Sequence, residues 1–458
     1  MVTKSETTKS APKFAGIAVP PELNKRNFFF LFFNTFVAGL LMSVFGILQP
    51  AFLKDVIKIN QDFAGSINGL LMNLNEIATL ALVALVGALS DKVGRKILAL
   101  VGFVVLALFF YLLGQANGIA FFLQVPTGIS SQISALLSFA PSRSAEFTQF
   151  APGLLITYVL RLFLGVGLIL CYPQFITMVA DYTDEKDRGK GMAMNGVMMA
   201  ISSLLIFGLF VPIMGKIGVL AFIYIIVAVA LGGALSTGLF LKDRLPEVKQ
   251  EKVSLLKIIP VVRKSLALKT SYWCCLITRA DIIILATFII TWAVKYGKEL
   301  ELSTGEATFK AALPMMVMSV ATLIAFPILG VMLDQWGRVP TIILALISGA
   351  IAMFLLAASP NPFSPLVYGA MLFASVGMAG AIAGANTLAS DASPKGMVGS
   401  ILGGLNTMQP LDTVLEGYLF DAFSPGWTFA VKGSASLILC VWMFMMKDRI
   451  SASLLEKA

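Results

Sequence analysis

The ten residues from Gly87 to Lys96 read GALSDKVGRK, and they place four charged side chains and two glycines between two long apolar stretches. A degenerate copy of this motif, GVMLDQWGRV, runs from Gly330 to Val339 and keeps the glycines, one aspartate and one arginine at the same spacing. Two copies of one polar motif, far apart in a single chain, indicate that the protein is built from two similar halves.

The composition indicates a membrane protein. The 458 residues are 58% apolar and only 13% charged, whereas soluble proteins are about 45–50% apolar and about 25% charged. The first 26 residues are polar and mixed in charge, so we expect no cleavable signal peptide. All four cysteines lie in apolar segments, which predicts buried small side chains rather than disulfides or a metal site. The chain has no histidine, so any proton transfer is expected to use carboxylates.

Apolar segments long enough to cross the roughly 30 Å hydrocarbon core of a bilayer recur along the chain. They are 27–53, 64–90, 97–115, 153–180, 190–213 and 217–241, then 271–296, 308–333, 340–358, 365–390, 397–421 and 427–446. This predicts an all-α integral membrane protein of two six-helix bundles. The bundles would cover 27–241 and 271–446, with a tail at 1–26, an insertion at 116–152, a basic linker at 242–270 and a second tail at 447–458.

The basic residues predict the orientation in the membrane. Most of the 34 lysines and arginines fall on one side if both tails and the linker are cytoplasmic, which is the usual bias of cytoplasmic loops. The net charge of +9 then reflects topology and gives no reason to expect nucleic acid. The insertion at 116–152 is expected outside, with a short helix on the membrane surface, because a further crossing would place the two polar motifs on opposite sides.

The motif residues Gly87, Asp91, Lys92, Gly94, Arg95 and Lys96 form the pattern G-x-x-x-D-[RK]-x-G-R-[RK]. Together with Asp334, Gly337 and Arg338 of the copy, they resemble the signature loop of the major facilitator superfamily of secondary transporters. The copy lacks the basic residues that would follow Asp334 and Arg338. The resemblance implies twelve membrane-spanning helices, with the two bundles related by an axis along the membrane normal.

The resemblance also implies a gating latch on the cytoplasmic side. Asp91 would dock on the start of the eleventh span, near 395–400, and Asp334 on the start of the fifth, near 188–191, because a carboxylate is favourable at the positive end of a helix. Arg95 would pair with a carboxylate below the fourth span, where Asp181, Asp184 and Glu185 lie. The alternative is that the motif is only a solvated, positively charged loop.

The fourth span carries a second resemblance, since Arg161, Gly165 and Gly167 match the superfamily pattern R-x-x-x-G-x-G. An arginine inside a membrane helix is costly, so it usually faces protein or water and serves a function. The alternative is a structural pairing with a neighbouring helix. The superfamily's antiporter signature in the fifth span is present only in fragments, with Val211 where glycine is expected, which weakens any prediction of drug–proton exchange.

Further polar residues inside predicted spans are candidates for the translocation path. They are Asn73 and Glu76 in the second span, Arg279 and Asp281 in the seventh, and Asn406, Gln409, Asp412 and Glu416 in the eleventh. Arg279 and Asp281 point to nearly opposite sides of a helix and are not expected to pair with each other, so either the helix is locally broken there or each residue finds a partner elsewhere. Glu416 has the alternative of an exposed helix end. Proton carriers are expected among Glu76, Asp281, Asp412 and Glu416.

These features predict a secondary transporter rather than an enzyme. It would move a small charged or zwitterionic organic solute by alternating access between the bundles, with protons as the candidate coupling ion, as a monomer in the inner membrane. We expect no cofactor, and the absence of a G-x-x-x-x-G-K-[ST] motif disfavours an ATP-driven pump. A facilitative uniporter and a membrane sensor of the same fold remain alternatives; the short stretch after Lys447 disfavours the sensor.

Overall fold

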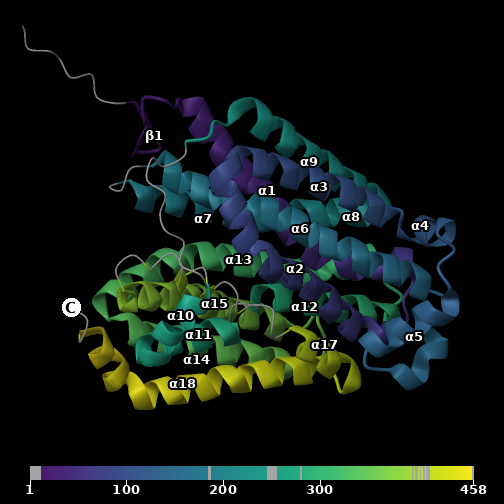
Figure 1. Cartoon of the computed structure of the whole chain (residues 1–458). Helices are drawn as coiled ribbons and strands as arrows, with labels where there is room; N and C mark the ends of the chain where they lie inside the picture. Colours follow the sequence, from purple (N-terminus) through teal and green to yellow (C-terminus); the bar gives the residue numbers. More distant parts are fainter. Residues whose placement is uncertain are drawn as a thin grey trace, which may run out of the picture.

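The computed structural model describes residues 12–183, 187–244, 255–278, 281–394, 397, 401–402, 404–405, 408 and 413–455. Nearly all of them are helical, so the predicted all-α fold is confirmed. The helices form two bundles, which lie one above the other in Figure 1. The upper bundle in this view includes α1, α3, α6, α7, α8 and α9, the lower one holds α10 to α18, and α5 of the first half lies at the lower right, level with α17.

The first bundle begins with a small β-hairpin, and its long helices make six crossings. Its elements are β1 (Lys13–Phe14), β2 (Ile17–Ala18), α1 (Lys25–Phe52), η1 (Leu53–Ile57), η2 (Gln61–Phe63), α2 (Ala64–Val93), α3 (Arg95–Gly114), α4 (Ala116–Phe122), α5 (Thr127–Leu137), η3 (Pro141–Phe147), α6 (Ala151–Tyr182), α7 (Arg188–Leu205), η4 (Ile206–Phe210), α8 (Val211–Ile217) and α9 (Val219–Phe240). Helices α7 and α8, joined by the π-helical turn η4, make one crossing.

The second bundle follows the linker. Its elements are α10 (Leu255–Lys264), α11 (Leu266–Thr278), α12 (Asp281–Glu299), α13 (Thr304–Gln335), α14 (Arg338–Ala357), α15 (Pro365–Ala392), α17 (Thr413–Ala422) and α18 (Pro425–Leu455). The seventh crossing consists of α11 and α12, and α17 is the last part of the eleventh.

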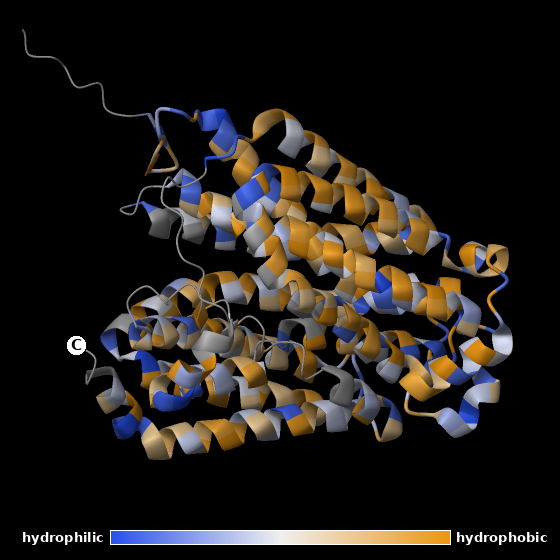
Figure 2. Ribbon diagram, in the orientation of Figure 1, coloured by the Kyte–Doolittle hydropathy of each residue, from blue (hydrophilic) through white to orange (hydrophobic). Residues whose placement is uncertain are grey.

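The outer surface of the bundles is apolar, as a lipid solvent requires. Nine helices in the described part of the chain are long and apolar enough to cross a membrane. On α3, for example, the exposed side chains include Val101, Val104 and Leu108. The same apolar character covers the middle of both bundles in Figure 2. A helix suits this environment because it satisfies its backbone hydrogen bonds internally, where no water is available to do so.

Several predicted boundaries differ from those of the structure. The seventh span begins at Leu266 rather than 271, and α18 continues to Leu455, so most of the predicted tail at 447–458 is helical. The insertion at 116–152 contains two short helices and a 3-10 segment rather than one surface helix. The predicted tail at 1–26 includes an ordered hairpin, whose Ile17 is buried.

The two ends of the molecule differ in how the bundles meet. We call the end with Gly94 and Gly337 the motif end, and the opposite end, with α4 and α5, the insertion end (Figure 1). The main apolar core runs from the first bundle into the second, where it includes Ile290 and Phe420. The motif-end part of the second bundle has its own core, which includes Leu388. Among the described residues, the core that the bundles share therefore lies toward the insertion end.

Candidate functional site

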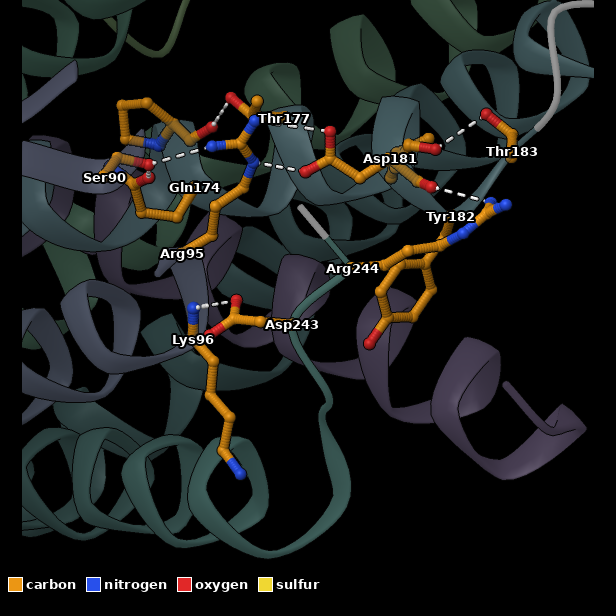
Figure 3. Close-up of polar contacts among 12 residues, drawn as sticks. Ser90, Arg95, Lys96, Gln174, Thr177, Asp181, Tyr182, Thr183, Asp243 and Arg244 are labelled. Carbon is orange, nitrogen blue, oxygen red and sulfur yellow. Dashed lines mark hydrogen bonds and ion pairs between the residues drawn. The ribbon is translucent and has the colours of Figure 1, made fainter. Parts of the chain in front are cut away.

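The first motif forms a tight turn between α2 and α3. Gly94 has a φ of +103°, in the left-handed region where a side chain is strained. A Cβ at this position would also overlap Oδ2 of Asp243. The other carboxylate oxygen of Asp243, Oδ1, accepts a hydrogen bond of 2.9 Å from the backbone N–H of Lys96 (Figure 3). Glycine is thus required here both by the backbone angle and by the carboxylate that covers the start of α3.

Arg95 ties this turn to the end of the fourth span. Its Nε donates to Oδ2 of Asp181, and the second guanidinium nitrogen donates to Oδ1 at 3.3 Å (Figure 3). A third contact of 3.3 Å reaches Oγ of Ser90, which in turn donates to Oε1 of Gln174 at 2.6 Å. Such a forked, charge-assisted contact fixes direction as well as distance. Of the three carboxylates considered from sequence, the structure pairs Asp181 with Arg95, and Asp184 and Glu185 lie outside the described residues.

The second motif repeats this arrangement in the other bundle. Gly337 has a φ of +93° between α13 and α14. Nε of Arg338 lies 2.8 Å from Oδ2 of Asp391, in the last turn of α15, and another guanidinium nitrogen donates to the carbonyl of Leu333 at 2.8 Å. Asp391 therefore corresponds to Asp181 in the first bundle. Sequence reasoning did not assign Asp391, although its place at the end of the tenth span mirrors that of Asp181.

The contacts of the predicted latch between the bundles lie outside the residues that the structure describes. Asp91 and Asp334 lie in the last turns of α2 and α13, but their side chains are outside what the structure describes. The same holds for most of 395–400. Among the other motif residues, Lys92 is exposed, whereas Gly87 and Lys96 are partly buried. Docking of the two aspartates on the opposite bundle stays a prediction.

Arg161 lies inside the first bundle, between the first, second and fourth spans. It is 5% exposed, and its guanidinium carbon lies 3.6 Å from the ring centroid of Phe45 in α1. Its Nε donates to the carbonyl of Leu71 in α2 at 3.2 Å. A guanidinium held over an aromatic face is a favourable cation–π arrangement. Arg161 is thus a fixed positive centre inside the first bundle.

Amide side chains lie near this centre. Asn73 is buried and donates to the carbonyl of Gly69 in its own helix at 3.0 Å. Gln49, which sequence reasoning missed, is also buried and donates to the side chain and the backbone carbonyl of Asn68 at 2.9 and 3.1 Å. Oε1 of Gln49 accepts no hydrogen bond from the described residues. Glu76 lies one turn beyond Asn73, and its side chain is not described.

The second bundle holds a buried ion pair between the seventh and twelfth spans. Nζ of Lys432 in α18 lies 3.2 Å from Oδ1 of Asp281 at the start of α12, and both side chains are almost fully buried. Asp281 and Arg279 were not expected to pair with each other, and the structure pairs Asp281 with Lys432. Sequence reasoning missed Lys432, although an isolated lysine in an apolar span was the available signal.

The remaining predicted path residues are not described at their side chains. Arg279, Asn406, Gln409 and Asp412 lie outside the described residues. Glu416 belongs to α17, toward the insertion end, and its side chain is likewise not described.

At the insertion end, polar contacts join the two bundles. Oγ1 of Thr304 donates to Oδ1 of Asp55 at 2.6 Å. Gly215 and Gly305 come so close that a Cβ on Gly305 would lie 2.5 Å from Cα of Gly215. Asp421 of α17 accepts hydrogen bonds from the start of α2. These contacts hold the two bundles together at the insertion end, so the structure is closed here.

Comparisons with known proteins agree with this architecture. The family model "Major Facilitator Superfamily" matches residues 31–411. The magnetosome protein MamH of Paramagnetospirillum magneticum is 23% identical over 436 residues, which are 94% of this chain and 95% of MamH. A crystal structure of the nucleoside transporter NupG superposes with a TM-score of 0.68 at 13% identity, covering 93% of this chain and 99% of NupG. A D-xylose-proton symporter superposes with a TM-score of 0.62 at 17% identity, covering 91% and 97%.

Proposed function

This chain belongs to the Major Facilitator Superfamily and is a membrane transporter rather than an enzyme, and we propose that it is a proton-coupled secondary transporter. Its solute would be a small charged or zwitterionic organic molecule, bound between the bundles. The observation that carries the proposal is that the two bundles share a core and hydrogen bonds at the insertion end, whereas the motif end of the second bundle has a separate core. Alternating access by rocking requires that the two bundles be held together at one end at a time.

The charged centres support this choice of solute. Arg161 supplies a positive charge in the first bundle, and Asp281 with Lys432 supplies charges of both signs in the second. Intramembrane charges are costly and usually mark the path of a substrate or an ion. A solute with both charges could interact with each bundle in turn.

Proton coupling would fall to carboxylates, because the chain has no histidine. Among the predicted carriers, Asp281 has the best-defined surroundings, since its buried carboxylate lies 3.2 Å from a buried ammonium. Protonation of Asp281 would remove the attraction and free Lys432 for another anion, such as the carboxylate of a solute. Glu76, Asp412 and Glu416 remain candidates on sequence grounds.

The location is also a proposal. The distribution of lysines and arginines supports cytoplasmic termini and a cytoplasmic motif end, with the insertion outside. We place the protein in the inner membrane. Since MamH is a magnetosome protein, a magnetosome membrane is the second location, and membrane fractionation of the native host distinguishes the two.

Flux into proteoliposomes tests the function. The purified full chain is reconstituted, and uptake of a panel of amino acids, carboxylic acids and betaines is measured with and without a pH gradient. We expect one class to accumulate when the gradient is applied, and Asp281→Asn to abolish this accumulation while counterflow exchange continues. Glu146→Gln is the matched control, because Glu146 is an exposed carboxylate of the insertion paired with Arg143.

The other outcomes contradict the proposal in different ways. Uptake that ignores the pH gradient in the wild-type protein would indicate a facilitative uniporter. Solute binding without any flux would indicate a sensor. Loss of exchange as well as accumulation in Asp281→Asn would show that Asp281 is needed for the movement itself, and coupling would then be assigned elsewhere.

A further inference from the structure

One carboxylate of the second bundle covers the amino terminus of a helix in the first. Asp421 lies in the last turn of α17, and Oδ1 accepts a hydrogen bond of 2.7 Å from the backbone N–H of Gly65. Oδ2 accepts from the backbone N–H of Ser66 at 2.5 Å and from its hydroxyl at 2.6 Å. Both backbone groups belong to the first turn of α2. A single side chain therefore makes three hydrogen bonds between the bundles.

Helix α2 has no cap of its own. The residue before its first turn is Phe63, whose side chain cannot accept a hydrogen bond, and the first turn contains no acidic residue. The first N–H groups of a helix have no partner within the helix, and they form its positive pole. Serine, threonine, aspartate or asparagine normally satisfies them from the residue just before the helix. In this protein the cap comes from the other bundle.

The backbones approach closely one turn away from Asp421. A Cβ on Gly417 would lie 2.5 Å from the carbonyl oxygen of Gly65, and a Cβ on Gly65 would lie 2.7 Å from the carbonyl oxygen of Gly417. The absence of both side chains lets α17 come near enough for its carboxylate to reach the end of α2. The contact is therefore built from residues of both helices and is a feature of their packing, not of one flexible side chain.

We propose that Asp421 is the positioning residue that holds the insertion end closed, as a latch between α17 and the start of α2. The proposal rests on the transport function proposed above, because a latch matters only if the bundles move apart. Opening this end separates Asp421 from Gly65 and Ser66 and leaves the start of α2 without its cap. The other polar contacts between the bundles here, such as that of Thr304 with Asp55, involve one hydrogen bond each. Among these contacts of described residues, Asp421 therefore contributes the most hydrogen bonds that break when the bundles separate.

The distance between the bundles at this end provides the test. Spin labels are attached to Ala221→Cys in α9 and Ala358→Cys at the end of α14, which are both exposed and lie in different bundles. The four native cysteines are buried and need not be replaced. Distances are measured by pulsed electron resonance in the purified full chain in nanodiscs, without any solute. The wild-type protein should show mainly the short distance of the closed end.

Asp421→Asn should raise the ratio of long to short distances by about tenfold or more, because the loss of even one hydrogen bond to a charged group shifts an equilibrium by that factor. Ser66→Ala removes one of the three contacts and should give a smaller rise in the same direction, and it serves also if Asp421→Asn fails to fold. Glu146→Gln removes a carboxylate at the same end that pairs within its own bundle, and it should leave the distances unchanged.

A wild-type distance distribution in both Asp421→Asn and Ser66→Ala would overturn the latch. So would an equal opening in Glu146→Gln, because the effect would then follow from any lost carboxylate at this end. The measurement needs no transported solute, so it is independent of the flux assay. If the insertion end opens in Asp421→Asn but no solute is transported in any assay, the proposed function is refuted and the latch stands. If a solute is transported but neither Asp421→Asn nor Ser66→Ala opens this end, the latch is refuted and the proposed function stands.

Discussion

The buried pair of Asp281 and Lys432 should be strongly coupled in the stability of the protein. Its 3.2 Å separation corresponds to an attraction of about 5 kcal/mol at an effective dielectric constant of about 20. Removing one member leaves the other charge buried without its partner, which typically costs about 3–5 kcal/mol. We therefore expect Lys432→Met and Asp281→Asn each to lower the free energy of unfolding by roughly 3 kcal/mol.

The double variant, Asp281→Asn with Lys432→Met, should be more stable than either single variant, because it buries no unpaired charge and replaces an ion pair with neutral groups of similar size. The free energies of unfolding are measured by titration with a denaturing detergent in mixed micelles, and the four proteins form a double-mutant cycle. Lys447→Met is the matched control, since Lys447 is an exposed lysine of the same helix, and its effect should stay within about 0.5 kcal/mol. Additive losses in the double variant would refute the reasoning, because they would mean that the two charges do not stabilise each other.

Two further predictions concern the ends of helices. Gly94→Ala combines a strained φ of +103° with an overlap on Asp243, and it should lower the free energy of unfolding by roughly 2 kcal/mol or more. Gly218→Ala, with a φ of +84° and no atom within 4 Å, should lower it only by the backbone strain of about 1 kcal/mol. Equal losses in the two variants would contradict the role of Asp243. Glu306 caps α13 together with Ser303, and the backbone N–H of Ser303 lowers the pKa of this carboxyl. Its stabilisation is therefore complete above the ordinary glutamate pKa and is lost as the pH falls through the lowered value, which hydrogen exchange at 304–308 should report as a smaller protection factor in acid, relative to the intrinsic exchange rate at the same pH. Glu306→Gln should remove most of this pH dependence.

The sequence was sufficient where a local rule determines the structure. The spans follow from runs of apolar residues, because a helix is the only single-segment structure that satisfies its backbone in lipid. The turns at Gly94 and Gly337 follow from the motif, since both glycines adopt a positive φ that other residues avoid. The partner of Arg95 could be narrowed to carboxylates at one end of the fourth span. The choice of Asp181 among them depends on helix rotation, which neighbouring side chains set.

The sequence was insufficient where a contact joins distant helices. Lys432 looks like one lysine in an apolar span, and nothing nearby in sequence points to Asp281. Asp421 looks like an ordinary residue at the end of a span, and its partners are 355 and 356 positions away. The weak signal was the phenylalanine before α2, because its side chain cannot accept a hydrogen bond from the first turn of the helix. Such a signal leaves room for a partner from elsewhere but does not identify one.

The contacts of the two ends suggest why this protein can change shape without losing its fold. At the motif end, the ion pairs of Arg95 with Asp181 and of Arg338 with Asp391 each lie within one bundle. They are unaffected when the bundles move as units, so they preserve each bundle as a rigid body. At the insertion end, the bundles are joined by the shared apolar core, by hydrogen bonds and by close glycine packing. The ion pairs therefore hold each bundle together as it moves, whereas opening the insertion end has to break the hydrogen bonds of Asp421 and separate the shared core.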